Sequence, residues 1–370
     1  MNTERAGERV HRGRLTVAIA AAAAIVVSSP FIGEIRNAIR AASPAQFRTI
    51  ISAAVITAIV VALIAAVARI RDRRVWRFGI LAVSMAIAAL YARAVATGNA
   101  DVDIVEHVHF VEYGLIAFLF YRAWRPLDDG SAVAWPLLAG VFVGIVDESV
   151  QWFVPGRVGE VHDIFLNAAA SVCGLLFAAS ADPPARFGLP SRRDATRRLA
   201  YALGVLLVAL ALFFQTVHLG HQVYDPEIGM FWSRYSAADL IAASRDRAER
   251  WRVSPPVVLH RLSREDQYLS EGLWHVQARN LAWTAGDPFS AWRENRILET
   301  FFEPVLDTPS YATPSRPRWP AEQRADTAAR VAGDPGVYMS RAAPYPIYTW
   351  APLLFWSAIA VTIAAVLTAC

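Results

Sequence analysis

Apolar stretches long enough to cross a lipid bilayer recur along this sequence and limit the folds open to it. About 20 apolar residues in a helix cross the roughly 30 Å of hydrocarbon, where backbone N–H and C=O groups must pair within their own segment. The sequence therefore predicts an all-α fold, a polytopic transmembrane helical bundle with about eight spans. The expected spans are residues 15–32, 47–68, 75–96, 104–124, 134–153, 163–179, 199–217 and 347–367.

The composition agrees with a membrane protein and limits the expected partners. Hydrophobic residues make up 55% of the chain and charged residues 18%, which lies outside the usual range of one soluble domain. The net charge of +4 comes wholly from arginine, because the chain contains no lysine, and we expect no nucleic-acid partner. Cys173 and Cys370 do not suggest a disulfide framework. Membrane lipids are the expected surroundings, and we assign no cofactor and no metal ligand.

The positions of the arginines predict the topology. They are concentrated in residues 5–14, 69–77 and 186–198, and the positive-inside rule puts these segments in the cytoplasm. The predicted protein is a multi-pass protein of a bacterial plasma membrane with both termini cytoplasmic and residues 218–343 extracytoplasmic. The first span could be a cleaved secretory signal, but a retained helix is favoured because Ser28, Ser29 and Pro30 replace a clean cleavage pattern.

The polar residues 218–343 are expected to form a mainly helical extracytoplasmic domain. A helical hairpin is predicted around a break at Gly286 and Asp287, with Ser263 as a candidate N-cap and Pro288 as the first residue of the second helix. The proline-rich residues 307–320 are predicted to be an extended linker. The expected organisation is residues 1–74, two N-terminal transmembrane helices; 75–179, a transmembrane domain; 180–217, a cytoplasmic loop and the seventh helix; 218–343, the extracytoplasmic domain; and 344–370, the last transmembrane helix.

Polar side chains interrupt the fourth, fifth and sixth spans near their predicted outer ends. Each ionised group inside the membrane costs a few kcal/mol, so such residues usually face the bundle interior and find partners there. Pro155 and Gly156, between the fifth and sixth spans, favour a type II turn that displays the following arginine. The predicted polar cluster consists of His109, Glu112, Tyr113, Asp147, Glu148, Gln151, Arg157, Asp163 and Asn167.

Three short motifs in this region resemble the VanZ-like family of bacterial membrane proteins. They are HFVEYG at 109–114, DESVQWFVPGR at 147–157 and DIFLN at 163–167, so the resemblance covers roughly residues 75–179. The resemblance implies a link to resistance against the glycopeptide antibiotic teicoplanin, which is associated with the founding member, and brings no established catalytic mechanism. One departure is Ala170 where a glycine is expected a turn after Asn167, with Gly174 a turn later.

The cluster allows several functions. The first is binding of an anionic lipid-linked or cell-wall component, or of a glycopeptide, with Arg157 as the contact to the anion. The second is a membrane-embedded hydrolase or metal-dependent enzyme, because His109, Glu112, Glu148 and Asp163 have the residue types of metal ligands and general bases, although no H-E-x-x-H motif occurs. Proton-linked transport and a purely structural hydrogen-bond network are the remaining alternatives.

Overall fold

The computed structural model divides into two compact units. The membrane unit comprises Met1–Gln151, Gly159–Phe213 and Trp356–Cys370, and the second unit comprises Trp152–Val158 and Phe214–Phe355. The described residues are 10–72, 75–96, 98, 100–127, 129–154, 157–184, 193–254, 264–309, 316–331, 336–343 and 345–369.

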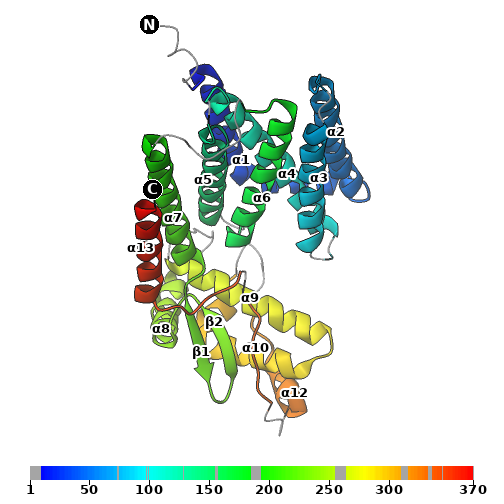
Figure 1. Cartoon of the computed structure of the whole chain (residues 1–370). Coiled ribbons are helices and arrows are strands. Elements are labelled where there is room, and N and C mark those ends of the chain that lie inside the picture. Colours follow the sequence, from blue (N-terminus) through cyan, green and yellow to red (C-terminus); the bar gives the residue numbers. More distant parts are fainter. Residues whose placement is uncertain are drawn as a thin grey trace. The chain divides into compact units, whose positions relative to one another are not determined.

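A helix occupies each of the expected spans, which confirms the all-α polytopic architecture (Figure 1). Six of these helices are long and apolar enough to cross a membrane; of the other two, α4 carries several acidic residues and α13 is shorter. They are α1 (Arg12–Ala42), α2 (Phe47–Arg69), α3 (Val75–Ala94), α4 (Ala100–Trp124), α5 (Ser131–Phe153), α6 (Val161–Ala181), α7 (Arg193–Val217) and α13 (Pro352–Thr368).

Three expected boundaries differ from the helix ends by five residues or more, and one of them is the start of α7 at Arg193 instead of residue 199. The first helix continues to Ala42 instead of ending at residue 32, and Pro30 lies inside it. The last helix begins at Pro352 instead of residue 347, because proline is well suited to the first helical position and the preceding Tyr348 pairs with Leu219 in a β-bridge.

Helix α6 lies at the centre of the membrane unit, where it packs against α3 and α4. At its crossing with α4, a Cβ added to Gly174 would lie 2.5 Å from the Cα of Gly114, so only glycine fits the observed backbone separation. On the α5 side, a Cβ on Gly144 would lie 3.1 Å from the Cβ of Asn167. Small residues at membrane helix interfaces let backbones approach closely. The glycines therefore bring α4, α5 and α6 within side-chain hydrogen-bonding reach.

The C-terminal end of α6 is held by an arginine of α3. Arg77 donates from Nε to the Ser180 carbonyl at 2.8 Å and from Nη2 to the Ala181 carbonyl at 2.6 Å. Its Nη1 pairs with Asp72 at 2.5 Å. A cation at a helix C-terminus satisfies the last carbonyls and interacts favourably with the helix dipole. Arg77 thereby fixes this end of the bundle.

The second unit combines helices with a β-hairpin that was not predicted from the sequence. Strands β1 (His221–Asp225) and β2 (Gly229–Ser233) are antiparallel, and the tight return uses Gly229 at φ 120°. Each strand has only five residues, and an alternation of side chains over so short a stretch cannot be distinguished from the sequence of a loop. The helices are α8 (Ala237–Val253), α9 (Arg264–Thr284), α10 (Pro288–Phe301), α11 (Glu303–Leu306) and α12 (Ala321–Val331), with β1, β2, α9 and α10 visible in Figure 1.

The expected helical hairpin is formed by α9 and α10. Gly286 has a φ of 76°, and Asp287 caps α10 by accepting a hydrogen bond from the Ser290 amide at 3.0 Å. Pro288 is the first helical residue, as predicted. Ser263 lies outside the described residues, as do 310–315 of the expected linker; residues 316–320 have no regular secondary structure.

Two carboxylates whose oxygens are all paired form a polar centre in the second unit. Glu294 accepts from His275 Nδ1 on one oxygen, at 2.6 Å, and from the Tyr338 and Ser340 hydroxyls on the other. Glu271 accepts from the Ser233 hydroxyl at 2.5 Å on one oxygen and from the Arg234 amide at 3.0 Å on the other. Every carboxylate oxygen of this centre therefore has a donor.

Burial has opposite net results for the pKa of these two carboxyls. Desolvation alone raises the pKa of Glu294, but the His275 charge and the hydrogen bonds from His275, Ser340 and Tyr338 outweigh it and lower the pKa below the ordinary 4.5. For Glu271, desolvation dominates and raises the pKa. Glu294 therefore stabilises the folded state as an anion.

Replacement of Gly174 by alanine should destabilise the membrane unit. The added methyl group must push α6 away from Gly114, and overpacking of this kind costs about 1 to 3 kcal/mol. Fluorescence-detected thermal unfolding of the detergent-purified protein should show a lower Tm. Gly79→Ala on α3 is the matched control, because nothing lies within 4 Å of a Cβ there. Equal melting of the two variants would contradict the close crossing.

Glu294→Gln should lower the free energy of unfolding by about 3 kcal/mol at pH 7, because it replaces a buried carboxylate that accepts hydrogen bonds from His275, Tyr338 and Ser340. Since the folded-state pKa is depressed, the contribution of Glu294 is complete above the ordinary pKa of 4.5 and is lost as the pH falls through the folded-state value. Urea unfolding followed by tryptophan fluorescence should show the difference from wild type narrowing below pH 4.5.

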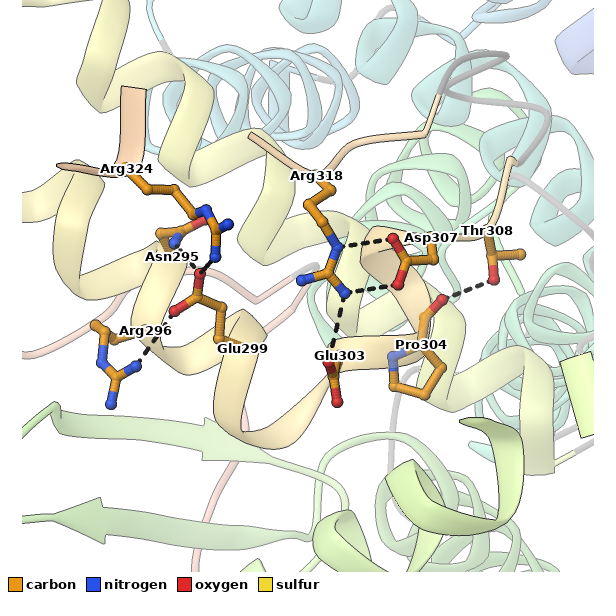
Figure 2. Close-up of polar contacts among 9 residues, drawn as sticks. All are labelled: Asn295, Arg296, Glu299, Glu303, Pro304, Asp307, Thr308, Arg318 and Arg324. Carbon is orange, nitrogen blue, oxygen red and sulfur yellow. Dashed lines mark hydrogen bonds and ion pairs between the residues drawn. The ribbon is translucent and has the colours of Figure 1, made fainter. Parts of the chain in front are cut away.

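The control for this experiment is Glu299→Gln on the same helix. Glu299 pairs with Arg296 at 3.2 Å and Arg324 at 3.3 Å near the surface (Figure 2), and such pairs contribute about 1 kcal/mol or less. A Glu294 effect no larger than that of Glu299, or one that does not change with pH, would show that the buried pair does not stabilise the unit.

Candidate functional site

Helix α4 is connected to both α5 and α6 through two side chains one turn apart. The Tyr113 hydroxyl donates to Asp147 Oδ2 at 2.9 Å, and His109 Nδ1 lies 2.9 Å from Asn167 Oδ1. An amide oxygen only accepts, so His109 Nδ1 carries the proton. The His109 and Tyr113 rings stack with centroids 6.1 Å apart. These contacts unite three helices around one polar core.

The amide of Gln151 joins the two carboxylates of α5. Its Nε2 donates to Asp147 Oδ2 at 3.1 Å and to Glu148 Oε1 at 2.9 Å, which uses both of its N–H groups. The second oxygen of Glu148 accepts from the Glu160 backbone amide at 3.3 Å. Two acidic side chains on successive residues are thus held by donors from the same helix and from the loop that follows it.

This core is deeply buried but incompletely paired. Tyr113, Glu148 and Asn167 are 0% exposed, and Asp147 is 3% exposed. Even so, Asp147 Oδ1 and Asn167 Nδ2 are buried atoms without a hydrogen-bond partner in the described structure. The Ser29 hydroxyl of α1 lies close enough to the Asp147 carboxylate to act on it as a donor, but the contact lacks the geometry of a normal hydrogen bond. Unpaired buried polar atoms are rare in folded proteins and call for an explanation.

A second, more exposed acidic group lies around the start of α6. His162 Nδ1 is 3.4 Å from Asp163 Oδ1, and Asp163 keeps 23% of its side chain exposed. Glu160, immediately before α6, is close enough to Asp163 and Glu106 to feel their charges. Burial raises the pKa of Glu160 to about 7, and the neighbouring carboxylates add to the rise while His162 opposes it. Such a group exchanges protons at neutral pH.

The structure divides the predicted cluster. It joins six members in the buried core: His109, Tyr113, Asp147, Glu148, Gln151 and Asn167.

The remaining three members lie elsewhere. Asp163 belongs to the outer acidic group, and Glu112 is half-buried on α4. Arg157 falls in the second unit and is described apart from the core. The proposed turn residues Pro155 and Gly156 lie outside the described residues.

Sequence reasoning missed Ser29 and Glu160 as neighbours of the cluster. Ser29 stands in an apolar stretch of α1 with no charged residue nearby to mark it. Glu160 follows a glycine in a loop, and only its position at the start of α6 could have drawn attention to it. Among the described residues, no three His, Cys, Asp or Glu side chains converge as a metal site would require.

Comparison with known families decides the identity of this region. The family described as VanZ/LLP1 matches residues 18–181. This region belongs to the VanZ-like family. The match starts at residue 18, so α1 and α2 are part of the VanZ-like region, whereas the resemblance seen in the sequence began at residue 75. No curated protein and no solved structure matches the chain.

The match of residues 18–181 and the apolar helices together establish the broad character of the chain. It is a multi-pass membrane protein with a VanZ-like region, and the similarity links that region to glycopeptide resistance. The VanZ-like region contains the whole buried polar core and the acidic group at the start of α6.

Glu160 should titrate near neutral pH in the folded protein. Infrared difference spectra of the purified protein should contain a carboxyl component that is half protonated at about pH 7, and Glu160→Gln should remove it. Glu34→Gln, which changes an exposed residue of α1, should leave the component in place. A component that survives in Glu160→Gln would assign the neutral titration to a different group.

Proposed function

We propose that the VanZ-like region binds an anionic lipid-linked or cell-wall component of the bacterial envelope at its buried polar core. The observation that carries this proposal is the unpaired Asn167 Nδ2, accompanied by the unpaired Asp147 Oδ1. An unused amide donor fits a ligand oxygen, and an unused carboxylate oxygen fits a ligand hydroxyl or ammonium group. A bound ligand would restore the free energy lost by leaving these groups unpaired.

The polar centre of the second unit supports this interpretation by contrast. Both oxygens of Glu294 and of Glu271 accept hydrogen bonds there, as expected for a network that only stabilises a fold. In the membrane core, Asp147 Oδ2 accepts two hydrogen bonds while Oδ1 accepts none. The carboxylate oxygens of the second unit are therefore all paired, whereas one oxygen of Asp147 is not; Gln267 Oε1, beside Glu271, is the unpaired atom of the second network.

The proposed orientation places the core toward the outer face of the membrane. Arg77 holds the C-terminal end of α6, beside the arginine-rich residues 69–77, whereas Asn167 lies in the N-terminal half of the same helix. By the positive-inside rule the arginine end is cytoplasmic. Both termini are then cytoplasmic, residues 218–343 are extracytoplasmic, and the core faces envelope components outside the plasma membrane.

An apolar groove in the membrane unit suits the lipid part of such a ligand. It has a volume of about 400 Å³ and runs between α2, α3, α4 and α6. Ala62, Phe110, Gly114, Gly174 and Phe177 are among its lining residues. Phe110 and Gly114 directly follow His109 and Tyr113 in the chain, so the same turns of α4 contribute to both the groove and the core. A hydrocarbon chain in the groove would gain about 0.8 kcal/mol for each buried methylene.

Arg157, a residue of the second unit, stays the predicted contact to an anionic group. Its guanidinium stays charged at all relevant pH values and offers a planar set of donors to carboxylate or phosphate oxygens. Arg157 lies in the segment between α5 and α6.

Binding of a lipid-linked cell-wall precursor to the protein in vesicles tests the proposal. Arg157→Gln and Asn167→Leu should each weaken binding at least about tenfold, which corresponds to about 1.4 kcal/mol. Arg93→Gln is the control. It removes one positive charge, as Arg157→Gln does, but from an exposed position on α3, and should bind like wild type. Unchanged affinity in both variants would refute the proposal, and the core would then be a structural network.

A membrane-embedded hydrolase is the second candidate, and the observation in its favour is Glu160. A carboxyl that titrates at about pH 7 beside His162 and Asp163 has the properties of a general acid or base. The vesicle experiment distinguishes this function, because cleavage of the precursor that is lost in Glu160→Gln requires an enzyme. A precursor that stays intact supports binding alone.

A further inference from the structure

The second unit contains a polar cleft that is independent of the VanZ-like region. Its volume is about 520 Å³, within the range of small-ligand sites. Helix α8, helix α11 and the residues that follow α11 form its walls. Figure 2 shows four of the lining residues, Glu303, Pro304, Asp307 and Thr308. The lining is completed by Arg247, Ala248, Trp251, Arg252, Pro309 and Arg316.

The carboxylates of the cleft share one arginine. Arg318 donates to the two oxygens of Asp307 at 2.7 and 2.6 Å and lies 3.5 Å from Glu303 (Figure 2). The hydrogen bond from Arg318 is the main reason that the pKa of Asp307 lies below its ordinary range. Asp246, on the adjoining turn of α8, pairs with Arg250 at 2.8 Å.

Three arginines remain at the cleft beyond these pairs. The lining residues Arg247, Arg252 and Arg316, together with Arg318, supply four positive charges against the two negative charges of Glu303 and Asp307, a surplus of two. Within the described part of the chain, Arg252 makes no hydrogen bond or ion pair. The cleft thus presents a positive field to small anions.

Arg247 is the most informative of these arginines because it is buried and poorly satisfied. Its residue is 5% exposed, and its Nη1 makes only long contacts of 3.4 Å to the Ala243 carbonyl and to Asp246. Its Nε, like the indole Nε1 of Trp251, has no hydrogen-bond partner in the described structure. A buried guanidinium with weak partners is costly, and a bound oxyanion would supply the missing acceptors.

We propose that this cleft binds the oxyanion group of a small ligand, the chemistry that carboxylates and phosphates share. Arg252 and Arg316 attract the anion at the open side of the cleft, and Arg247 meets it from the buried side. The site lies outside residues 18–181, so it neither requires the proposed function of the membrane core nor fails with it.

Calorimetric titration of the full-length protein in detergent tests the site. The probes are inorganic phosphate and acetate, each compared with chloride at equal ionic strength. The double variant Arg252→Gln/Arg316→Gln removes the two outer arginines without touching the buried Arg247. Arg250→Gln is the control, because Arg250 is on the same helix, pairs with Asp246 and does not line the cleft.

We expect an oxyanion probe to bind more tightly than chloride, with affinity lowered at least tenfold in the double variant and unchanged in the control. Tighter binding of phosphate identifies a phosphate-bearing ligand, and tighter binding of acetate a carboxylate. Failure of both probes to exceed chloride, or equal affinity of the double variant and wild type, would overturn the proposal.

Discussion

The close approach of α4, α5 and α6 is the constraint on which the membrane unit depends. Carboxylates inside a membrane protein are tolerated when hydrogen-bond donors reach them. The Tyr113 hydroxyl on α4 donates to Asp147 Oδ2 on α5 at 2.9 Å. Gly144 makes this possible, because a Cβ there would lie 3.6 Å from Tyr113 and 3.1 Å from Asn167. The glycine contact between α4 and α6 brings His109 to Asn167 in the same way. The polar pairs of the core therefore depend on the close packing of the helix backbones.

The two ends of the bundle have opposite chemistry. At one end, Arg77 caps the last carbonyls of α6, and Arg125 pairs with Asp182 at 3.0 Å. At the other, Glu160 and Asp163 gather around the first turn of α6, where the helix dipole favours negative charge. This polarity follows from the sequence of α6 and its flanks. At the arginine end, the last carbonyls of α6 are paired. At the acidic end, titratable carboxyl groups remain partly exposed.

Much of the fold could be predicted from hydropathy, whereas the pairing within the site could not. The expected spans were confirmed as helices because lipid allows a single chain segment few other ways to satisfy its backbone. The β-hairpin at 221–233 was missed, since its five-residue strands carry no long periodic pattern. For the site, helical spacing selected residues on three helices, and the structure joins six of them in the buried core. It could not show that Asp163 turns to His162 while Asn167 turns to His109, because that depends on how each helix is rotated.

The sequence by itself determined that this protein is a helical membrane protein and which stretches form its apolar helices, and it predicted that the polar residues of three spans face inward. These conclusions follow from local composition, since the cost of exposing polar groups to hydrocarbon does not depend on the details of packing. Only the tertiary structure decided which polar atoms are paired. Asn167 Nδ2 and Asp147 Oδ1 are unpaired because of the separations and rotations of α4, α5 and α6, and those are set by contacts between residues far apart in the chain, such as Gly114 and Gly174.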